Sequence, residues 1–83
     1  MEKKELRNKI EEIFKEILPD LSELSDNTSS GDVQAWDSLN HVMLISKIEN
    51  QFNIKFELTD MLSMQNFGEI CRAVETKLQE NEL

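Results

Sequence analysis

The fold is decided by the stretch that opens with Trp36-Asp37-Ser38-Leu39 and continues as an apolar helical run to Phe52. Asp37 is a favourable helix N-cap, because its carboxylate can accept hydrogen bonds from the free backbone N–H groups of the first turn. Ser38 then takes the first helical position, beside the positive end of the helix dipole. A phosphate ester on its hydroxyl would be stabilised there by the dipole and the exposed N–H groups. We therefore interpret Ser38 as a candidate attachment point for a phosphate-linked group.

The helix predicted over residues 38–52 has two apolar sides. At about 100° per residue, one side carries a stripe that we expect to be buried, made of Leu44, Ile45, Ile48 and Phe52. Leu39 and Met43 point roughly the opposite way. Two sizeable apolar side chains are therefore expected on the exposed face, close to Ser38.

Two further segments have the spacing of amphipathic helices. The first covers residues 3–18 and ends before Pro19, because the residue before a proline is pushed out of helical geometry. Its expected buried stripe is Leu6, Ile10, Ile13, Phe14, Ile17 and Leu18. The last covers residues 67–80 and begins with a pair, Asn66 and Glu69, that is similar to a capping box. Its expected buried stripe is Phe67, Ile70, Cys71, Val74 and Leu78.

The connections complete the predicted fold. The segment 19–36 is long for a compact domain, so we expect it to be tied down. Its expected anchors are Leu21, Leu24, Val33 and Trp36, and a turn is expected at residues 29–32. Residues 53–58 alternate polar and apolar, and without a second strand they are predicted to form an extended link whose Ile54, Phe56 and Leu58 face the core. A short helical turn over residues 59–63 is expected to place Met61 and Leu62 inward.

These elements predict an all-α fold, a small antiparallel bundle of three long helices plus one short helix, with the long loop between helices one and two. At 83 residues the chain is expected to form a single domain over residues 1–83, with a modest core and no deep cavity. Such a core leaves little room to enclose a substrate, which disfavours an enzyme. The net charge of −8 disfavours nucleic-acid binding, because phosphates repel an acidic surface.

Cysteine usage and hydropathy suggest where the protein works. A single cysteine, Cys71, excludes an internal disulfide framework and fits a reducing compartment. No apolar run reaches the ~18 residues of a membrane span, and the first residues are not followed by the apolar core of a signal peptide. We therefore expect a cytoplasmic protein without a membrane span.

Three motifs together identify a family resemblance that covers nearly the whole chain. Asp37-Ser38-Leu39 opens a helix, Phe52-Asn53-Ile54-Lys55-Phe56 stands at its end, and Asn66-Phe67-Gly68-Glu69-Ile70 opens the last helix. In this arrangement the chain resembles the acyl carrier protein family. The three-residue Asp-Ser-Leu string is a weak signal alone. Its place at the head of an amphipathic helix, midway along an acidic helical chain, makes it specific.

The resemblance implies a function that composition does not show. A phosphopantetheinyl transferase would modify Ser38 with 4′-phosphopantetheine from coenzyme A, and the thiol of this arm would carry an acyl group as a thioester. By carry-over, Asp37 helps hold the metal of the transferase and the phosphate, and Leu39 belongs to the partner-facing surface. The other expected partner-binding residues are Asn40, His41, Met43 and Lys47. Expected partners are the transferase, an acyl-loading ligase or synthase, and downstream acyl-processing enzymes. We expect a monomer with no catalytic residues and no metal of its own.

The second helix departs from the family pattern. Fatty-acid carriers usually present several carboxylates there, whereas Glu49 is the only acid between Leu39 and Phe52. Each exposed ion pair contributes only roughly 0–1 kcal/mol, but several together alter electrostatic steering and partner choice. The departure favours a dedicated fatty-acid, polyketide or related biosynthetic pathway, and Trp36 before Asp37 is a weaker cue in the same direction.

Two alternative functions stay open at this point. One is an acidic helical interaction module that is never modified and uses the same Leu39 and Met43 face. The other is an aminoacyl or D-alanyl carrier of the peptidyl type, which shares this architecture.

Three smaller features are interpreted as structural and not as functional sites. His41 stands three residues after Ser38, but a hydrolase dyad lacks a nucleophile elbow and an evident oxyanion hole. Residues 26–37 loosely resemble a calcium loop, but Thr28 and Ser30 replace its carboxylates. Cys71 fits the buried stripe of the last helix as a small hydrophobe.

Overall fold

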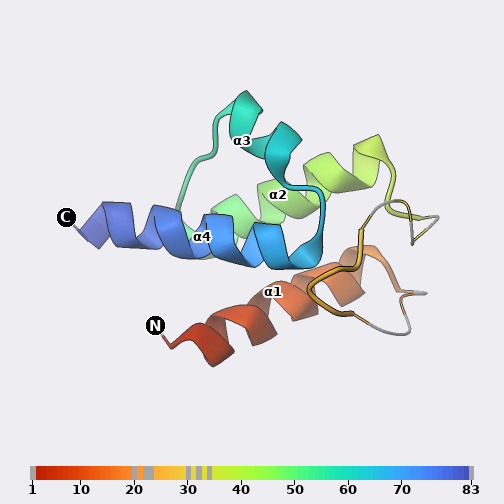
Figure 1. Cartoon of the computed structure of the whole chain (residues 1–83), viewed down its shortest axis with the longest axis horizontal. Coiled ribbons are helices and arrows are strands. Elements are labelled where there is room, and N and C mark those ends of the chain that lie inside the picture. Colours follow the sequence, from red (N-terminus) through yellow and green to blue (C-terminus); the bar gives the residue numbers. More distant parts are fainter. Residues whose placement is uncertain are drawn as a thin grey trace.

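The computed structural model describes residues 2–19, 21, 24–29, 31, 33 and 35–82, without the side chains of the last two. The described residues form four helices, α1 (Lys3–Ile17), α2 (Ser38–Phe52), α3 (Leu58–Ser63) and α4 (Phe67–Glu82). The all-α prediction is confirmed, with three long helices and one short one. α1 runs against the direction of α2 and α4, and α3 crosses above them (Figure 1). Among the described residues no helix is long and apolar enough to cross a membrane.

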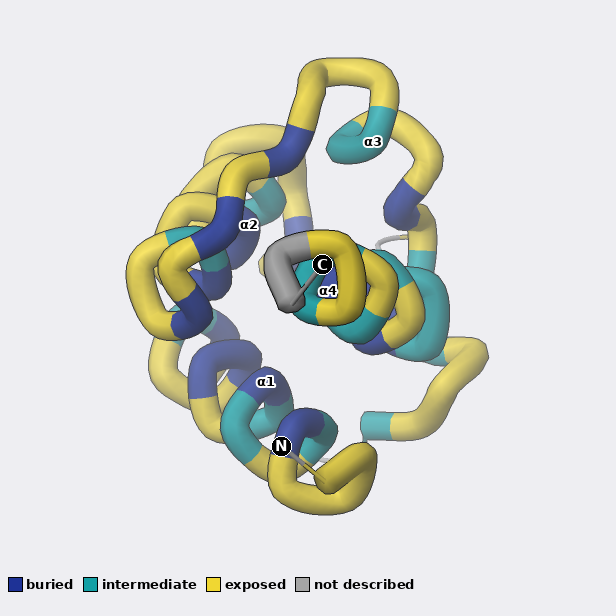
Figure 2. The backbone as a smooth tube through the Cα atoms, turned by 90° about the vertical axis from the view of Figure 1, so that its left-hand side faces the viewer, coloured by how far each residue is buried: buried dark blue, intermediate teal, exposed yellow. Residues whose placement is uncertain are grey.

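The core is centred on Phe14 of α1. Its ring packs edge-to-face against Trp36, with centroids 5.1 Å apart, and against Phe67 of α4, at 5.2 Å. Such pairs add about 0.5–1.5 kcal/mol to the stabilisation from burial. Dark blue segments of the three long helices face one another in Figure 2, where α3 is mostly exposed. The buried stripes predicted for the long helices are confirmed, with Ile17 and Leu78 partly buried at their margins.

Two predictions about the segment between α2 and α4 are wrong. Leu58 and Leu62, both expected to face the core, are each 70% exposed. The polar–apolar alternation ends at Phe56, because the chain turns helical at Leu58 and the period of two no longer applies. Met64, just after α3, is buried in their place with 3% exposure. Ile54 and Phe56 are buried as predicted.

The long first connection is tied to the start of α4. The N–H groups of Phe67 and Gly68 donate to the carbonyl oxygens of Thr28 and Asp26, at 3.0 and 2.9 Å. The loop therefore satisfies amides that the helix leaves without an internal acceptor. Leu21, Leu24 and Val33 are partly buried against the core, as predicted. The turn predicted at residues 29–32 falls partly outside the described residues.

Arg7 of α1 also binds the long connection between α1 and α2. Its Nη2 lies 2.6 Å from Asp26 Oδ1, and its guanidinium carbon lies 5.1 Å from the Phe67 ring centroid. The hydrogen bond to Asp26 raises the pKa of Arg7. One cation thus joins the first helix, the long connection and the last helix. Sequence reasoning missed this contact, because Arg7 reads as one charge among many on a solvated helix face.

Replacing Gly68 with alanine should destabilise the protein through this loop. A Cβ at residue 68 would stand 3.0 Å from Asp26 Cβ and 3.1 Å from its carbonyl oxygen. Overpacking costs about 1–3 kcal/mol, and the better helix propensity of alanine returns up to about 1 kcal/mol. We expect the free energy of unfolding, measured by urea titration, to fall by about 1–2 kcal/mol.

Gly31→Ala is the matched control, since a Cβ at residue 31 would meet its nearest atom at an ordinary 3.7 Å. Equal stability of Gly68→Ala and Gly31→Ala would show that the loop yields freely at Asp26.

Candidate functional site

Ser38 lies exposed at the first position of α2. Asp37 caps the helix as predicted, because its Oδ1 accepts the Asn40 N–H at 2.8 Å while its carbonyl accepts the His41 N–H at 2.8 Å. Helix geometry leaves the amides of Ser38 and Leu39 without an acceptor inside the helix. The hydroxyl therefore stands next to two outward N–H donors and the positive end of a fifteen-residue helix.

The backbone that leads into Ser38, residues 35–37, is anchored to the core. Trp36 is only 2% exposed and rests against Phe14. The backbone N–H of Trp36 donates to the Val33 carbonyl at 3.0 Å. The Ala35 carbonyl accepts from the Asp37 N–H at 3.0 Å and from Asn40 Nδ2 at 2.6 Å. These contacts fix the backbone that presents the serine, although the serine itself is exposed.

The His41 ring is partly buried, and both of its nitrogens lie within hydrogen-bond distance of protein groups. Trp36 Nε1 lies 3.1 Å from His41 Nδ1, and His41 Nε2 lies 3.2 Å from the carbonyl oxygen of Met61 in α3. The indole N–H can only donate and the carbonyl can only accept, so the imidazole is the neutral tautomer protonated at Nε2. Both ring nitrogens are engaged by these two partners, which leaves neither to act as a base for Ser38.

The other expected partner-binding residues divide into two groups. Leu39 and Met43 are 70% and 46% exposed, as their helical phase predicted. Asn40 uses its side-chain amide on Ala35, and the Lys47 ammonium forms an ion pair with Glu16 of α1. The structure therefore brings the two apolar residues to the surface beside Ser38 and ties the two polar ones into the protein.

Sequence reasoning missed three further members of this surface. Val42 is 53% exposed, and Leu58 and Leu62 of α3 are exposed as described above. Lys47 marks the side of α2 that faces α1, and Val42 lies about 140° around the helix from it. Leu58 and Leu62 are four residues apart and so share the outer side of α3. We call these five exposed residues the apolar face: Leu39, Val42, Met43, Leu58 and Leu62.

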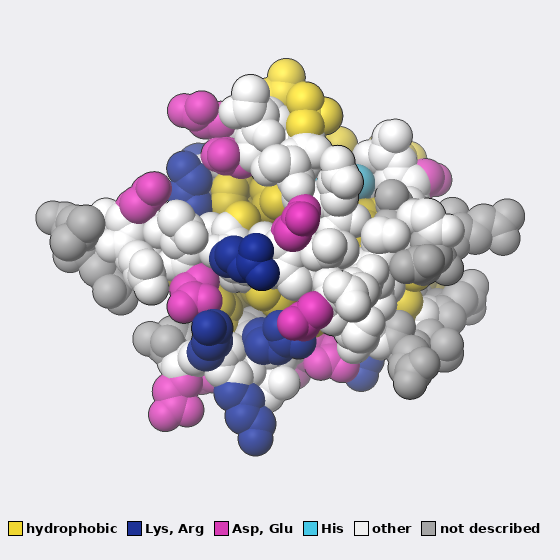
Figure 3. Space-filling model, in the orientation of Figure 1, with side chains coloured by type: hydrophobic (Ala, Val, Ile, Leu, Met, Phe, Trp, Pro, Cys, Tyr) yellow, Lys and Arg dark blue, Asp and Glu magenta, His cyan; other side chains and the backbone are white. Residues whose placement is uncertain are grey.

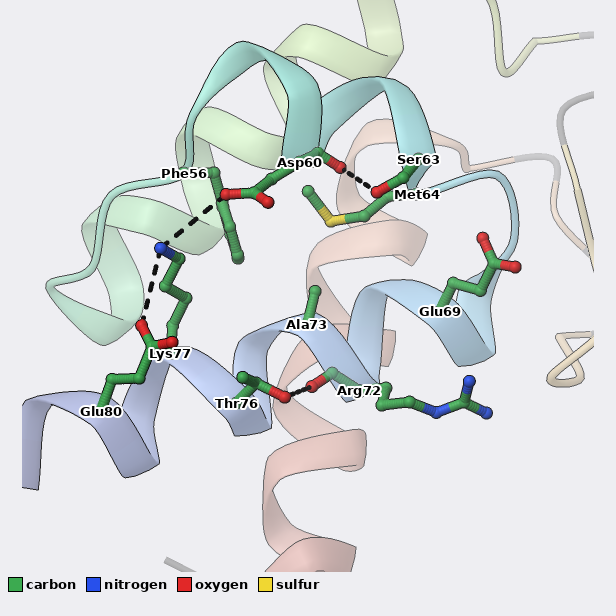
Figure 4. A pocket seen from close by; sticks show the side chains of 10 residues that line it. All are labelled: Phe56, Asp60, Ser63, Met64, Glu69, Arg72, Ala73, Thr76, Lys77 and Glu80. Atoms are coloured by element: carbon green, nitrogen blue, oxygen red, sulfur yellow. Dashed lines mark hydrogen bonds and ion pairs between the residues drawn. The ribbon is translucent and has the colours of Figure 1, made fainter.

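A cleft of about 430 Å³ lies between α3 and α4. Figure 3 shows apolar side chains at the bottom of this hollow. Lys77 spans one edge, with its Nζ 3.8 Å from Asp60 of α3 and 3.7 Å from Glu80 (Figure 4). Phe56, Met64 and Ala73 line it with apolar surface. The sequence offered no signal for the cleft, because its walls come from three separate segments.

Cys71 is buried in the core, and Asp26 is engaged by an ion pair within the protein. Burial raises the pKa of Cys71 to about 11, with the Arg7 charge partly opposing the shift, so the thiol stays protonated near neutral pH. Asp26, the first position of the loosely calcium-like stretch, is bound to Arg7. Ser30 and Asp32 of that stretch lie outside the described residues. The part of the chain that the structure describes contains no group of three or more acidic, His or Cys side chains placed to hold a metal.

A helical bundle that presents a capped, exposed serine at the head of its second long helix has the architecture of a carrier domain. Residues 8–74 match the family model described as the phosphopantetheine attachment site. The chain therefore belongs to the phosphopantetheine-binding carrier family of the acyl carrier proteins, whose prosthetic group is 4′-phosphopantetheine.

Solved structures agree with this family. The chain is similar to the holo acyl carrier protein of Geobacter metallireducens, with a TM-score of 0.83 and 33% identity over 93% of this chain and 90% of that one. It shares its fold with a putative acyl carrier protein of Mycobacterium tuberculosis, with a TM-score of 0.79 and 22% identity over 86% of this chain and 96% of that one. No curated protein sequence matches the chain significantly.

Proposed function

We propose that Ser38 carries the 4′-phosphopantetheine arm and that the protein holds acyl intermediates on it as thioesters. The observation that carries the proposal is the exposed Ser38 hydroxyl at the capped N-terminus of α2. In the transfer, the Ser38 oxygen forms a phosphodiester with the pantetheine phosphate of coenzyme A. The bond to adenosine 3′,5′-bisphosphate breaks, and the hydroxyl proton leaves to the transferase.

The residues around Ser38 fit this group. The arm's phosphate would lie near the outward amides of Ser38 and Leu39, where the helix dipole favours an anion. Asp37 uses Oδ1 for the helix cap, and we propose that its carboxylate also helps hold the metal ion that the transferase brings. The arm, when attached, supplies a thiol for thioester chemistry. The chain contributes presentation and docking, and catalysis is left to its partners.

The test is incubation of the whole chain with coenzyme A and a broad-specificity phosphopantetheinyl transferase. The intact mass should rise by one phosphopantetheine, and peptide mapping should place the addition on Ser38. A known carrier protein in the same reaction shows that the transferase is active. Addition at another residue, or none while the control carrier is modified, would favour the unmodified interaction module.

We also propose that the protein serves a dedicated fatty-acid, polyketide or related pathway in the cytoplasm, as a single-domain monomer. The support for a dedicated pathway is the low charge of α2. Glu49, its one acid, accepts the Phe56 N–H through Oε2 at 2.8 Å and is thus committed inside the protein. Lys47 is paired with Glu16. A partner would meet apolar and neutral polar side chains on this helix.

Docking through such a surface should depend little on salt. The transferase KM for the wild-type chain should change less than about twofold between roughly 0.05 and 0.5 M salt, since steering by exposed charges is what salt screens. Met43→Glu with Ser46→Glu adds two carboxylates at exposed positions and should make KM rise with salt. A wild-type KM that rises tenfold over the same range would show that charges elsewhere on the acidic surface dominate docking.

A further inference from the structure

α3 packs only loosely against the rest of the protein. None of its six residues is buried, and its outer side carries Leu58 and Leu62. Its position is therefore set by the buried residues that flank it, Phe56 and Met64, and by polar contacts from its neighbours. One of these is the ion pair between Asp60 and Lys77, whose atoms stand 3.8 Å apart at the edge of the cleft (Figure 4). A partly exposed ion pair of this kind contributes little to holding a helix in place.

The contact from α2 is of a different kind. His41 is partly buried, and its ring lies nearly parallel to the indole of Trp36, with centroids 6.1 Å apart and an interplanar angle of 23°. Its Nδ1 accepts the indole N–H, and its Nε2 reaches the Met61 carbonyl. Trp36 is in turn held edge-on by Phe14 at the centre of the core. A rigid chain of contacts thus runs from Phe14 through the indole and the imidazole to the backbone of α3.

This chain of contacts decides the shape of the apolar face. Leu39, Val42 and Met43 come from α2, whereas Leu58 and Leu62 come from α3. The placement of the two groups relative to each other therefore depends on how α3 is held against α2. His41 is three residues from Ser38, so it makes this connection next to the proposed attachment point.

We propose that His41 is a positioning residue that holds α3 against α2, so that the apolar face docks as one surface onto partner enzymes that offer an apolar, weakly charged groove. This inference rests on the proposed carrier function. The charge distribution supports this choice of partner. Although the chain carries −8 overall, the charged side chains of α2, Glu49 and Lys47, are engaged within the protein. The side of α2 that carries the apolar face therefore offers a partner little charge. The transferase that modifies Ser38 serves as the probe for docking.

His41→Phe is the main variant, because phenylalanine keeps an aromatic ring beside Trp36 and removes both hydrogen bonds. We expect amide hydrogen exchange in residues 58–64 to speed up roughly fivefold, the scale of one lost hydrogen bond. The transferase KM should rise by a similar factor while kcat stays within about twofold, because the Ser38 cap is untouched. His41→Gln offers one donor and one acceptor and should recover part of the loss.

A double-mutant cycle separates positioning from simple loss of a contact. Leu62→Ala should raise KM in the wild-type background and have much less effect when combined with His41→Phe, because α3 is then no longer held in register. Equal effects of Leu62→Ala in both backgrounds would overturn the proposal. Unchanged exchange in residues 58–64 of His41→Phe would overturn it as well.

The wild-type chain provides a further measurement that does not depend on the variant folding. Nitrogen chemical shifts of the His41 ring should report the neutral tautomer protonated at Nε2, with Nδ1 as the acceptor. A ring protonated at Nδ1 would contradict the geometry on which the proposal rests. Failure of the carrier function would appear differently, as a wild-type chain that is never modified while exchange and tautomer still show α3 held by His41.

Discussion

Replacing Ser38 with alanine should abolish modification by phosphopantetheinyl transferase completely. The phosphodiester needs the serine oxygen, and alanine offers no substitute atom at the head of α2. The first helical position tolerates alanine, and the Asp37 cap that stabilises the helix does not involve the serine hydroxyl. The loss should therefore appear without a loss of fold. Intact-mass spectrometry after incubation with coenzyme A measures it directly.

Ser46→Ala is the matched control, since Ser46 is also an exposed serine on α2. This variant should be modified as fully as the wild type. Circular dichroism should give the same helicity for both variants. Full modification of Ser38→Ala would move the attachment point to another residue and would remove the basis of the proposed function.

Replacing Phe14 with alanine should have the largest effect on stability. Phe14 is fully buried and packs edge-to-face on both Trp36 and Phe67, so its ring joins α1, the long connection and α4. Removing such a side chain costs about 3–5 kcal/mol. At roughly 0.05–0.15 kcal/mol per residue, this is a large part of the stability of a chain of this size. Urea unfolding followed by Trp36 fluorescence should show a midpoint shifted far toward zero denaturant.

Two control variants show whether the loss of stability comes from the buried ring of Phe14. Phe14→Leu keeps most of the buried volume and should cost less than the alanine change. Leu39→Ala removes an apolar side chain that is 70% exposed, and should change stability by no more than about 0.5 kcal/mol. A cost below about 1 kcal/mol for Phe14→Ala would mean that the site collapses around the cavity and that the aromatic cluster is not the centre of the core.

The long helices were predictable because their signals are local. The bounds of α2 were predicted to the residue, since Asp37 is a good N-cap and the buried stripe from Leu44 to Phe52 keeps a helical period. At its other end, Asn53 adopts the left-handed conformation, with φ of 55°, that commonly closes a helix. Asn66 also caps as predicted, because its Oδ1 accepts the Glu69 N–H at 2.8 Å.

The short third helix shows where local signals fail. Leu58 belongs to an alternating stretch by sequence and to a helix by structure, and a six-residue segment is too short for its period to be recognised. The result matters for function, because the two leucines predicted to be buried are exposed instead and belong to the proposed docking face.

The sequence by itself determined the three long helices, their buried sides, the capped serine and the family. The helices, their buried sides and the cap depend on residues within about one or two helical turns of one another, where spacing along the chain is also spacing in three dimensions. The family depends on the order of three such local motifs along the chain. Only the tertiary structure decided that His41 faces Trp36 and Met61, that Arg7 binds Asp26 under the start of α4, and that Lys77 closes the edge of a cleft. These contacts join residues up to twenty positions apart, as in His41 and Met61. Helical phase tells which side of a helix turns inward, but the partner it meets there depends on how the helices pack.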